Sequence, residues 1–157
     1  MFVFTAKFHR KRAVVFVLLL GVLLSAAIVF KSSRTEEDPA RTVIAAETNE
    51  ARVAYLTQLG WAVKSEPVEI LQLWLPETLE AEPFASYNML QLSQGFDMTP
   101  HCAHAVTRYT YTVTNPPQGG VPCQANLYVC EGALIAGDIV TLGEGGTRST
   151  LAYPKAS

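Results

Sequence analysis

The side chains best suited to metal binding or covalent chemistry lie in the second half of the chain. His101, Cys102 and His104 stand close together, and two more cysteines follow at Cys123 and Cys130. Imidazole and thiolate groups bind zinc, but a tetrahedral structural site normally combines two short ligand spacings. Cys123 and Cys130 are seven residues apart in a predicted strand, so their side chains leave opposite faces of the sheet. We therefore expect no metal site and no cofactor.

The same residues also suggest nucleophilic chemistry. A catalytic thiolate needs a base that a third group holds in position. Cys102 with His101 or His104 supplies only adjacency in a predicted loop. We therefore assign no catalytic residue, and an envelope hydrolase or redox enzyme that uses Cys102 with one of these histidines is kept as the alternative function.

Asp138 lies in an otherwise apolar segment, 133–140. A buried carboxylate there would have a raised pKa and could be functional, whereas an exposed or edge aspartate is the commoner case. Its face depends on the preceding turn. If Glu131 and Gly132 form a two-residue turn, Asp138 lies on the same face as Leu127. If Gly132 instead forms a bulge, Asp138 lies on the other face.

A small set of aromatic and polar side chains could form a site for a ligand, and the candidates are Tyr87, Asn88, Gln91, Asn126 and Asp138. Tyrosines at strand or helix spacing belong more often to a core than to a ligand groove. Polar residues on a helix are more often a hydrated face or caps to nearby loops.

The elements that must position these residues follow from capping signals and apolar periodicity. Thr48 or Asn49 can cap a helix over Glu50–Leu59 that ends at Gly60, and a second helix over Phe84–Gln94 ends at Gly95. Segments with strand character lie at 68–75, 105–113, 123–130 and 133–140. The sequence predicts an α+β domain whose two helices pack on one face of an antiparallel sheet that ends in a three-strand meander.

Alternation along the first two meander strands predicts which side chains are buried. The helix-facing set is Tyr109, Tyr111, Val113, Ala125, Leu127 and Val129, and the more exposed set is Arg108, Thr110, Gln124 and Asn126. For the two strands to share the buried face, odd-numbered residues must lie opposite odd-numbered residues.

The N-terminal part of the chain predicts a membrane anchor. Residues 13–30 are eighteen in number and carry no charge, and at about 1.5 Å per residue they match the thickness of a bilayer core. Four basic residues in 1–12 favour a cytoplasmic N-terminus. A cleaved secretory signal, with small residues at 25–27, is the alternative. Residues 31–47 read as a linker, and 48–157 as a domain outside the cell.

Charge restricts the partners of that domain. From residue 48 onward five basic residues stand against ten acidic ones, a net charge of −5, whereas nucleic-acid binding requires a concentrated basic surface. We expect no nucleic acid as a partner. The expected partners are the lipid bilayer, through residues 13–30, and an unknown extracytoplasmic protein or small ligand bound by a non-enzymatic module of the cell envelope.

An ordered set of short motifs connects the domain to a known family. These are Asn49–Leu56, Leu59–Trp61, Tyr87–Gln91, Gln94–Asp97, Arg108–Tyr111, Ala125–Leu127 and Gly137–Asp138. Together they resemble the uncharacterised bacterial family named domain of unknown function 4830, over about residues 48–141. The resemblance implies short, membrane-anchored proteins of Gram-positive bacteria and no assigned activity. The chain departs from the family where Ala136 replaces a glycine and where its tail, 142–151, lacks an aromatic residue.

Overall fold

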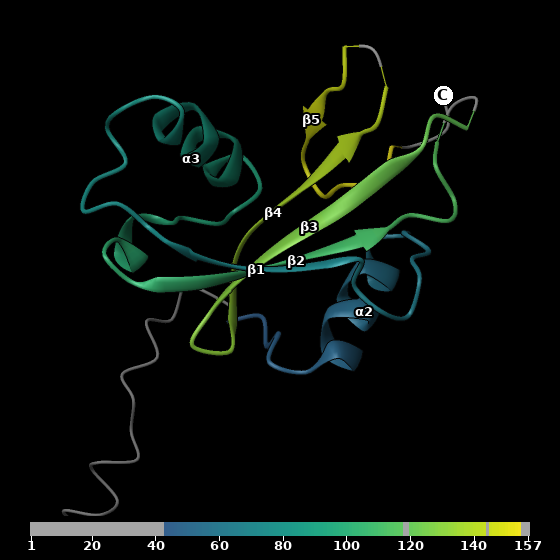
Figure 1. Ribbon diagram of the computed structural model, residues 1–157, viewed down its shortest axis with the longest axis horizontal. Coiled ribbons are helices and arrows are strands. Elements are labelled where there is room, and N and C mark those ends of the chain that lie inside the picture. The colour runs from purple at the N-terminus through teal and green to yellow at the C-terminus, as the bar shows by residue number, and fades with distance from the viewer. Residues whose placement is uncertain (1–42, 118–119, 144, 155–157) are drawn as a thin grey trace, which may run out of the picture. The chain divides into compact units, whose positions relative to one another are not determined.

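The computed structural model describes residues 43–117, 120–143 and 145–154 (Figure 1). In chain order, these residues form α2 (Asn49–Gln58), β1 (Glu69–Trp74), α3 (Phe84–Leu92), a 3₁₀ turn η1 (Thr99–His101), β2 (Ala105–Thr112), β3 (Cys123–Cys130), β4 (Ala133–Thr141) and β5 (Arg148–Ser149). The predicted cytoplasmic tail, the predicted membrane segment 13–30 and most of the predicted linker lie outside the described residues. Within the described part, no helix has the length and apolar character needed to cross a membrane.

The strands form one antiparallel sheet in the order β1-β2-β3-β4-β5, so each strand pairs with its neighbour in the chain. Tyr109 lies opposite Leu127 and Tyr111 lies opposite Ala125, which confirms the predicted odd-to-odd register. The short strand β5 was not predicted. It adds only two residues to the sheet beside Ile139 and Val140 of β4.

Both helices begin and end close to the predicted residues. The Thr48 hydroxyl accepts a hydrogen bond from the backbone N–H of Ala51 at 3.2 Å, which caps α2 as expected. After each helix a glycine adopts a left-handed conformation, with φ of +97° at Gly60 and +86° at Gly95. The predicted helix ends at Gly60 and Gly95 are therefore confirmed.

The prediction that both helices pack on one face of the sheet is wrong, because α2 and α3 lie on opposite sides (Figure 1). Leu56 of α2 packs in a core with Tyr111 and Leu127, whereas Tyr87 of α3 packs in a second core with Val106 and Tyr128. Side chains from both faces of β3 and β4 are buried, so both faces need a cover. One helix with its flanking segments covers each face.

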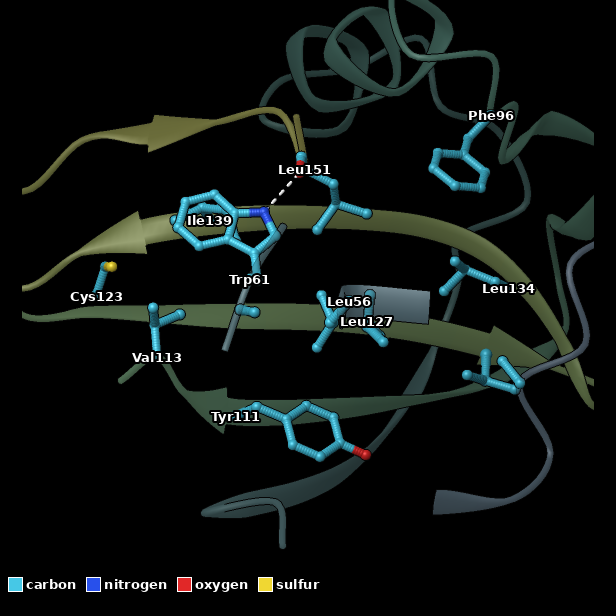
Figure 2. Close-up of a cluster of buried hydrophobic side chains, with 13 residues drawn as sticks. Leu56, Trp61, Phe96, Tyr111, Val113, Cys123, Leu127, Leu134, Ile139 and Leu151 are labelled. Carbon is cyan, nitrogen blue, oxygen red and sulfur yellow. Dashed lines mark hydrogen bonds between the residues drawn. The ribbon is translucent and has the colours of Figure 1, made fainter. Parts of the chain in front are cut away.

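The core on the α2 side is the larger of the two (Figure 2). Leu56 and Leu127 are fully buried at its centre, and Trp61 donates its indole N–H to the carbonyl oxygen of Leu151 at 2.7 Å. This hydrogen bond ties the segment after β5 back to the segment after α2. The indole N–H is thereby satisfied in an apolar setting.

The predicted burial of the strands is confirmed on the α2 side only. Tyr111, Val113, Ala125, Leu127 and Val129 are buried, and Tyr109 is half-buried. The prediction of greater exposure is wrong for two members of the opposite set, since Thr110 and Asn126 are only 3% and 7% exposed. The cover on the second face removes both from solvent.

The compact unit begins at Val43, five residues before the predicted boundary at Thr48. Ala45 forms an antiparallel bridge with Ala133, and the backbone N–H of Ala46 donates to the carbonyl oxygen of Gly132 at 2.8 Å. The buried guanidinium of Arg52 donates to the carbonyl oxygens of Ala46 and Glu47 at 2.7 and 2.8 Å. The end of the predicted linker is therefore part of the fold.

Candidate functional site

A row of polar side chains crosses the sheet on the side that faces α3. Thr110 of β2, Asn126 of β3 and Asp138 of β4 lie opposite one another in the register. Thr110 donates its hydroxyl to Asn126 Oδ1 at 2.8 Å, and Asn126 Nδ2 donates to Asp138 Oδ1 at 2.7 Å. All three are buried, so each hydrogen bond satisfies groups that would otherwise carry a desolvation cost.

Asp138 ends this row and connects it to α3. Its side chain is fully buried, and Oδ2 accepts a hydrogen bond from the Tyr87 hydroxyl at 2.6 Å. Arg148 Nε lies 3.5 Å from the same oxygen, while the Arg148 side chain is 51% exposed. Among the described residues, the salt-bridge partner of this buried carboxylate is Arg148, which lies at the surface.

The pKa of Tyr87 is raised far above its ordinary value. Burial is the largest cause, and the adjacent negative charge of Asp138 adds to it. The guanidinium of Arg148 also lies 5.0 Å from the centre of the Tyr87 ring. Tyr87 is therefore held as a neutral hydrogen-bond donor to Asp138.

A β-bulge decides the face on which Asp138 lies. Cys130 pairs with Ala133, so Glu131 and Gly132 form the two-residue turn of the first alternative, both with positive φ. That alternative placed Asp138 on the same face as Leu127, and this consequence is wrong. Tyr128 pairs with Ala136 while Val129 pairs with Leu134, so Ile135 is an extra residue that reverses the faces. Asp138 is also not the exposed or edge residue that the commoner interpretation favoured.

Two of the other candidate residues stabilise the fold through hydrogen bonds to neighbouring segments. Asn88 accepts a hydrogen bond from the backbone N–H of Met98 at 3.0 Å and donates to Thr99 at 3.3 Å, which secures the segment after α3. Gln91 accepts from the backbone N–H of Gly137 at 2.9 Å. Of the five candidates, Tyr87, Asn126 and Asp138 therefore come together, and Asn88 and Gln91 are engaged elsewhere.

Gly137 receives a second contact from the segment just after α3. Gln94 Nε2 donates to the Gly137 carbonyl oxygen at 2.8 Å, and Gln94 Oε1 accepts from the backbone N–H of Leu151 at 2.8 Å. Gln91 and Gln94 thus satisfy the β4 backbone next to the point where β5 pairs. A Cβ on Gly137 would overlap Leu151, so this position has no room for a side chain.

An apolar groove of about 220 Å³ opens beside Tyr87. Its lining side chains come from the end of β1, the start of α3, the second core and β5, and they are Leu73, Trp74, Leu75, Pro83, Phe84, Tyr87, Met98, Tyr128 and Arg148. Arg148 is the only charged residue among them. The groove thus combines apolar walls with one guanidinium and with the half-buried Tyr87, whose hydroxyl is bound to Asp138. This lining suits an apolar ligand that carries an acceptor or an anion.

The cysteines and histidines of the described residues do not gather into one metal site. Cys123 and Cys130 belong to the two opposite cores, which confirms that their side chains leave different faces of the sheet. Burial raises the pKa of both thiols. His104 Nδ1 lies 2.8 Å from the carbonyl oxygen of Cys102, a contact to the backbone rather than to the thiol. Among the described residues, no three His, Cys, Asp or Glu side chains are grouped as a metal site would need.

The ordered motifs agree with a comparison against protein families. The model of the family described as Domain of unknown function (DUF4830) matches residues 55–139, which run from α2 into β4. The chain belongs to this family. No curated protein and no solved structure gives a significant match. The DUF4830 match therefore assigns the domain but no activity.

Sequence reasoning missed most of the groove. Arg148 lies beyond the segment matched by the DUF4830 model, in a strand of two residues that is too short to show periodicity. Phe84 and Met98 were not singled out because apolar residues near a helix are usually core. The one available signal for Arg148 was its charge, since it is one of few basic residues in an acidic domain.

Proposed function

We propose that this DUF4830 domain is a non-enzymatic binding module of the cell envelope that takes an apolar side chain of a protein or peptide partner into the groove between β1 and α3. The observation that carries the proposal is the groove itself. Its walls are apolar, and two of its lining aromatic side chains, Trp74 and Phe84, are 70% and 38% exposed.

Arg148 gives the proposed ligand a polar end. The Arg148 side chain remains half exposed although its guanidinium forms an ion pair with Asp138. An apolar group followed by a carboxylate or a backbone carbonyl would place each part against a matching surface. The buried row from Thr110 to Asp138 supports this arrangement because it fixes Tyr87, and with it one wall of the groove.

The proposed location is the outer side of the membrane. Residues 13–30 would anchor the chain in the lipid bilayer, and the basic residues before them would stay in the cytoplasm. Protease added to intact protoplasts should then digest the domain. Complete protection of the domain, with digestion after lysis, would contradict this topology.

Binding can be tested with anilinonaphthalene sulfonate, an apolar aromatic anion that matches the groove and Arg148. The wild-type domain should bind it saturably, with enhanced fluorescence. Phe84→Asp should weaken binding by at least about tenfold, because it puts a carboxylate at the apolar rim. The helix should persist, since an acidic residue is favourable in its first turn.

Met89→Asp is the matched control, because Met89 lies on the same helix, is 71% exposed and does not line the groove. It should leave probe binding unchanged. Equal loss of binding in both variants, or no saturable binding by the wild type, would contradict the proposed function.

A further inference from the structure

Strand β1 is an open edge of the sheet, because it pairs only with β2 in the described strand order. The backbone N–H of Leu75 donates to the carbonyl oxygen of His104 at 3.0 Å, just beyond the strand. In an antiparallel pair the residues alternate between facing the neighbour and facing away. The backbone groups of Ile70, Gln72 and Trp74 therefore point outward from the edge.

This edge lacks the features that normally prevent pairing with another chain. Edge strands are usually protected by lysine, proline or a bulge. The strand reads Glu-Ile-Leu-Gln-Leu-Trp, and its register with β2 is continuous. Glu69 is its only charged residue, and its carboxylate is paired with Arg108. Ile70 and Trp74 are 61% and 70% exposed.

We propose that β1 pairs antiparallel with β1 of a second copy of this chain, centred on Gln72, so that one sheet continues through both subunits. A two-fold axis perpendicular to the sheet keeps each face on its own side, as a continuous sheet requires. Centring on Gln72 places the outward backbone groups of Ile70 opposite those of the partner subunit's Trp74. All the outward N–H and C=O groups of Ile70, Gln72 and Trp74 then find partners.

The side chains fit this register as well as the backbone does. Ile70 would lie beside the partner's Trp74, and Leu71 beside the partner's Leu73. Gln72 would face its own copy, where two amides can hydrogen-bond to each other. Glu69 falls outside the paired residues, so no like charges meet. A strand that is complementary to itself in this way favours a second copy over an unrelated peptide.

Leu73 and Trp74 of β1 also line the groove, but the proposed pairing is argued from the outward backbone of β1 and does not depend on the ligand proposed for the groove. Opposite residues of this kind have Cα atoms about 5.5 Å apart, within the range that a disulfide spans. We therefore expect Gln72→Cys, in the full-length chain carrying Cys102→Ser, to form a disulfide-linked dimer on mild oxidation. Gln58→Cys is the matched control, because Gln58 is an exposed glutamine on α2. Equal cross-linking of the two variants, or none at Gln72→Cys, would overturn the proposal.

Charge exchange at Gln72 tests the pairing without a covalent bond. Two differently tagged full-length chains should co-purify when both are wild type, and several-fold less when both carry Gln72→Lys, because two ammonium groups then face each other. One chain with Gln72→Lys and one with Gln72→Glu should co-purify again. Gln58→Lys in both chains should have no effect. Self-pairing would be refuted if two Gln72→Lys chains associated as well as two wild-type chains. It would also be refuted if the protein were a monomer whose β1 amides became protected from hydrogen exchange only when an extended peptide was added.

Discussion

The buried carboxylate of Asp138 offers the sharpest test of how the second face of the sheet is stabilised. Asp138→Ala would leave the Tyr87 hydroxyl and the Asn126 amide without their acceptor beneath α3, where Asn126 is buried and Tyr87 is half-buried. Each unsatisfied buried donor costs about 1–3 kcal/mol, so we expect a loss of about 3 kcal/mol in the free energy of unfolding. Loss of the ion pair with Arg148 adds little to this free energy, because the Arg148 side chain is half exposed and solvent screens the charge.

Asp138→Asn should cost less, about 1–2 kcal/mol, because one carbonyl oxygen can still accept from Asn126 while Tyr87 turns its hydroxyl to accept from the new amide. The assay is urea unfolding of the compact unit from Val43 to Ser157, followed by the fluorescence of buried Trp61. Glu77→Ala, at an exposed loop residue, should stay within about 0.5 kcal/mol of the wild type.

A double-mutant cycle separates the hydrogen bond from the general loss of packing. Tyr87→Phe removes one of the donors that Asp138→Ala leaves unsatisfied, so the double variant should be more stable than the sum of the single losses by about 1 kcal/mol or more. Strict additivity of the two losses, or a cost of Asp138→Ala no larger than that of Glu77→Ala, would refute the reasoning.

Three further changes test the account. Above pH 10 the unfolded chain loses the Tyr87 proton, whereas the folded chain keeps it because the pKa of Tyr87 is raised in the fold. The free energy of unfolding should therefore fall as the pH rises, and it should fall less steeply in Tyr87→Phe. Equal pH dependence of the two proteins in urea unfolding would contradict this expectation. Gly60→Val and Gly95→Val should each lower the free energy of unfolding by about 1 kcal/mol or more, as thermal unfolding would measure. The loss should be larger for Gly60→Val because Tyr153 lies 3.3 Å from the new Cβ. Gly137→Ala should cost about 1–3 kcal/mol through overlap with Leu151, whereas Gly143→Ala, in open space, should be near neutral; equal melting temperatures would count against the packing described.

The α2 side of the fold could be predicted because its signals are local. Thr48 and Gly60 mark the ends of α2, and the alternation of Tyr109 and Tyr111 with polar neighbours fixes one buried face. The α3 side could not be predicted in the same way. Polar side chains such as Thr110 and Asn126 look solvated in a sequence, whereas here they satisfy one another under a cover.

The candidate site depended on two features that periodicity does not reveal. Nothing in the apolar segment around Ile135 marks it as a bulge, although this one extra residue places Asp138 on the face of Asn126 instead of the face of Leu127. Arg148 reaches Asp138 through a strand of two residues. Tyr87 and Asp138 could be named as candidates, but their hydrogen bond joins residues 51 positions apart and needs the fold to exist.

The most direct test of the groove as a binding site uses the methionine methyl groups. The chain has three methionines, and two lie in the described domain: Met98 lines the groove and is 3% exposed, whereas Met89 is 71% exposed on the same side of the fold but outside the groove. With methyl-labelled methionine, titration of anilinonaphthalene sulfonate should shift the Met98 signal saturably and leave the Met89 signal in place. A shift of Met89 with an unmoved Met98 would contradict the assignment of the groove as the binding site.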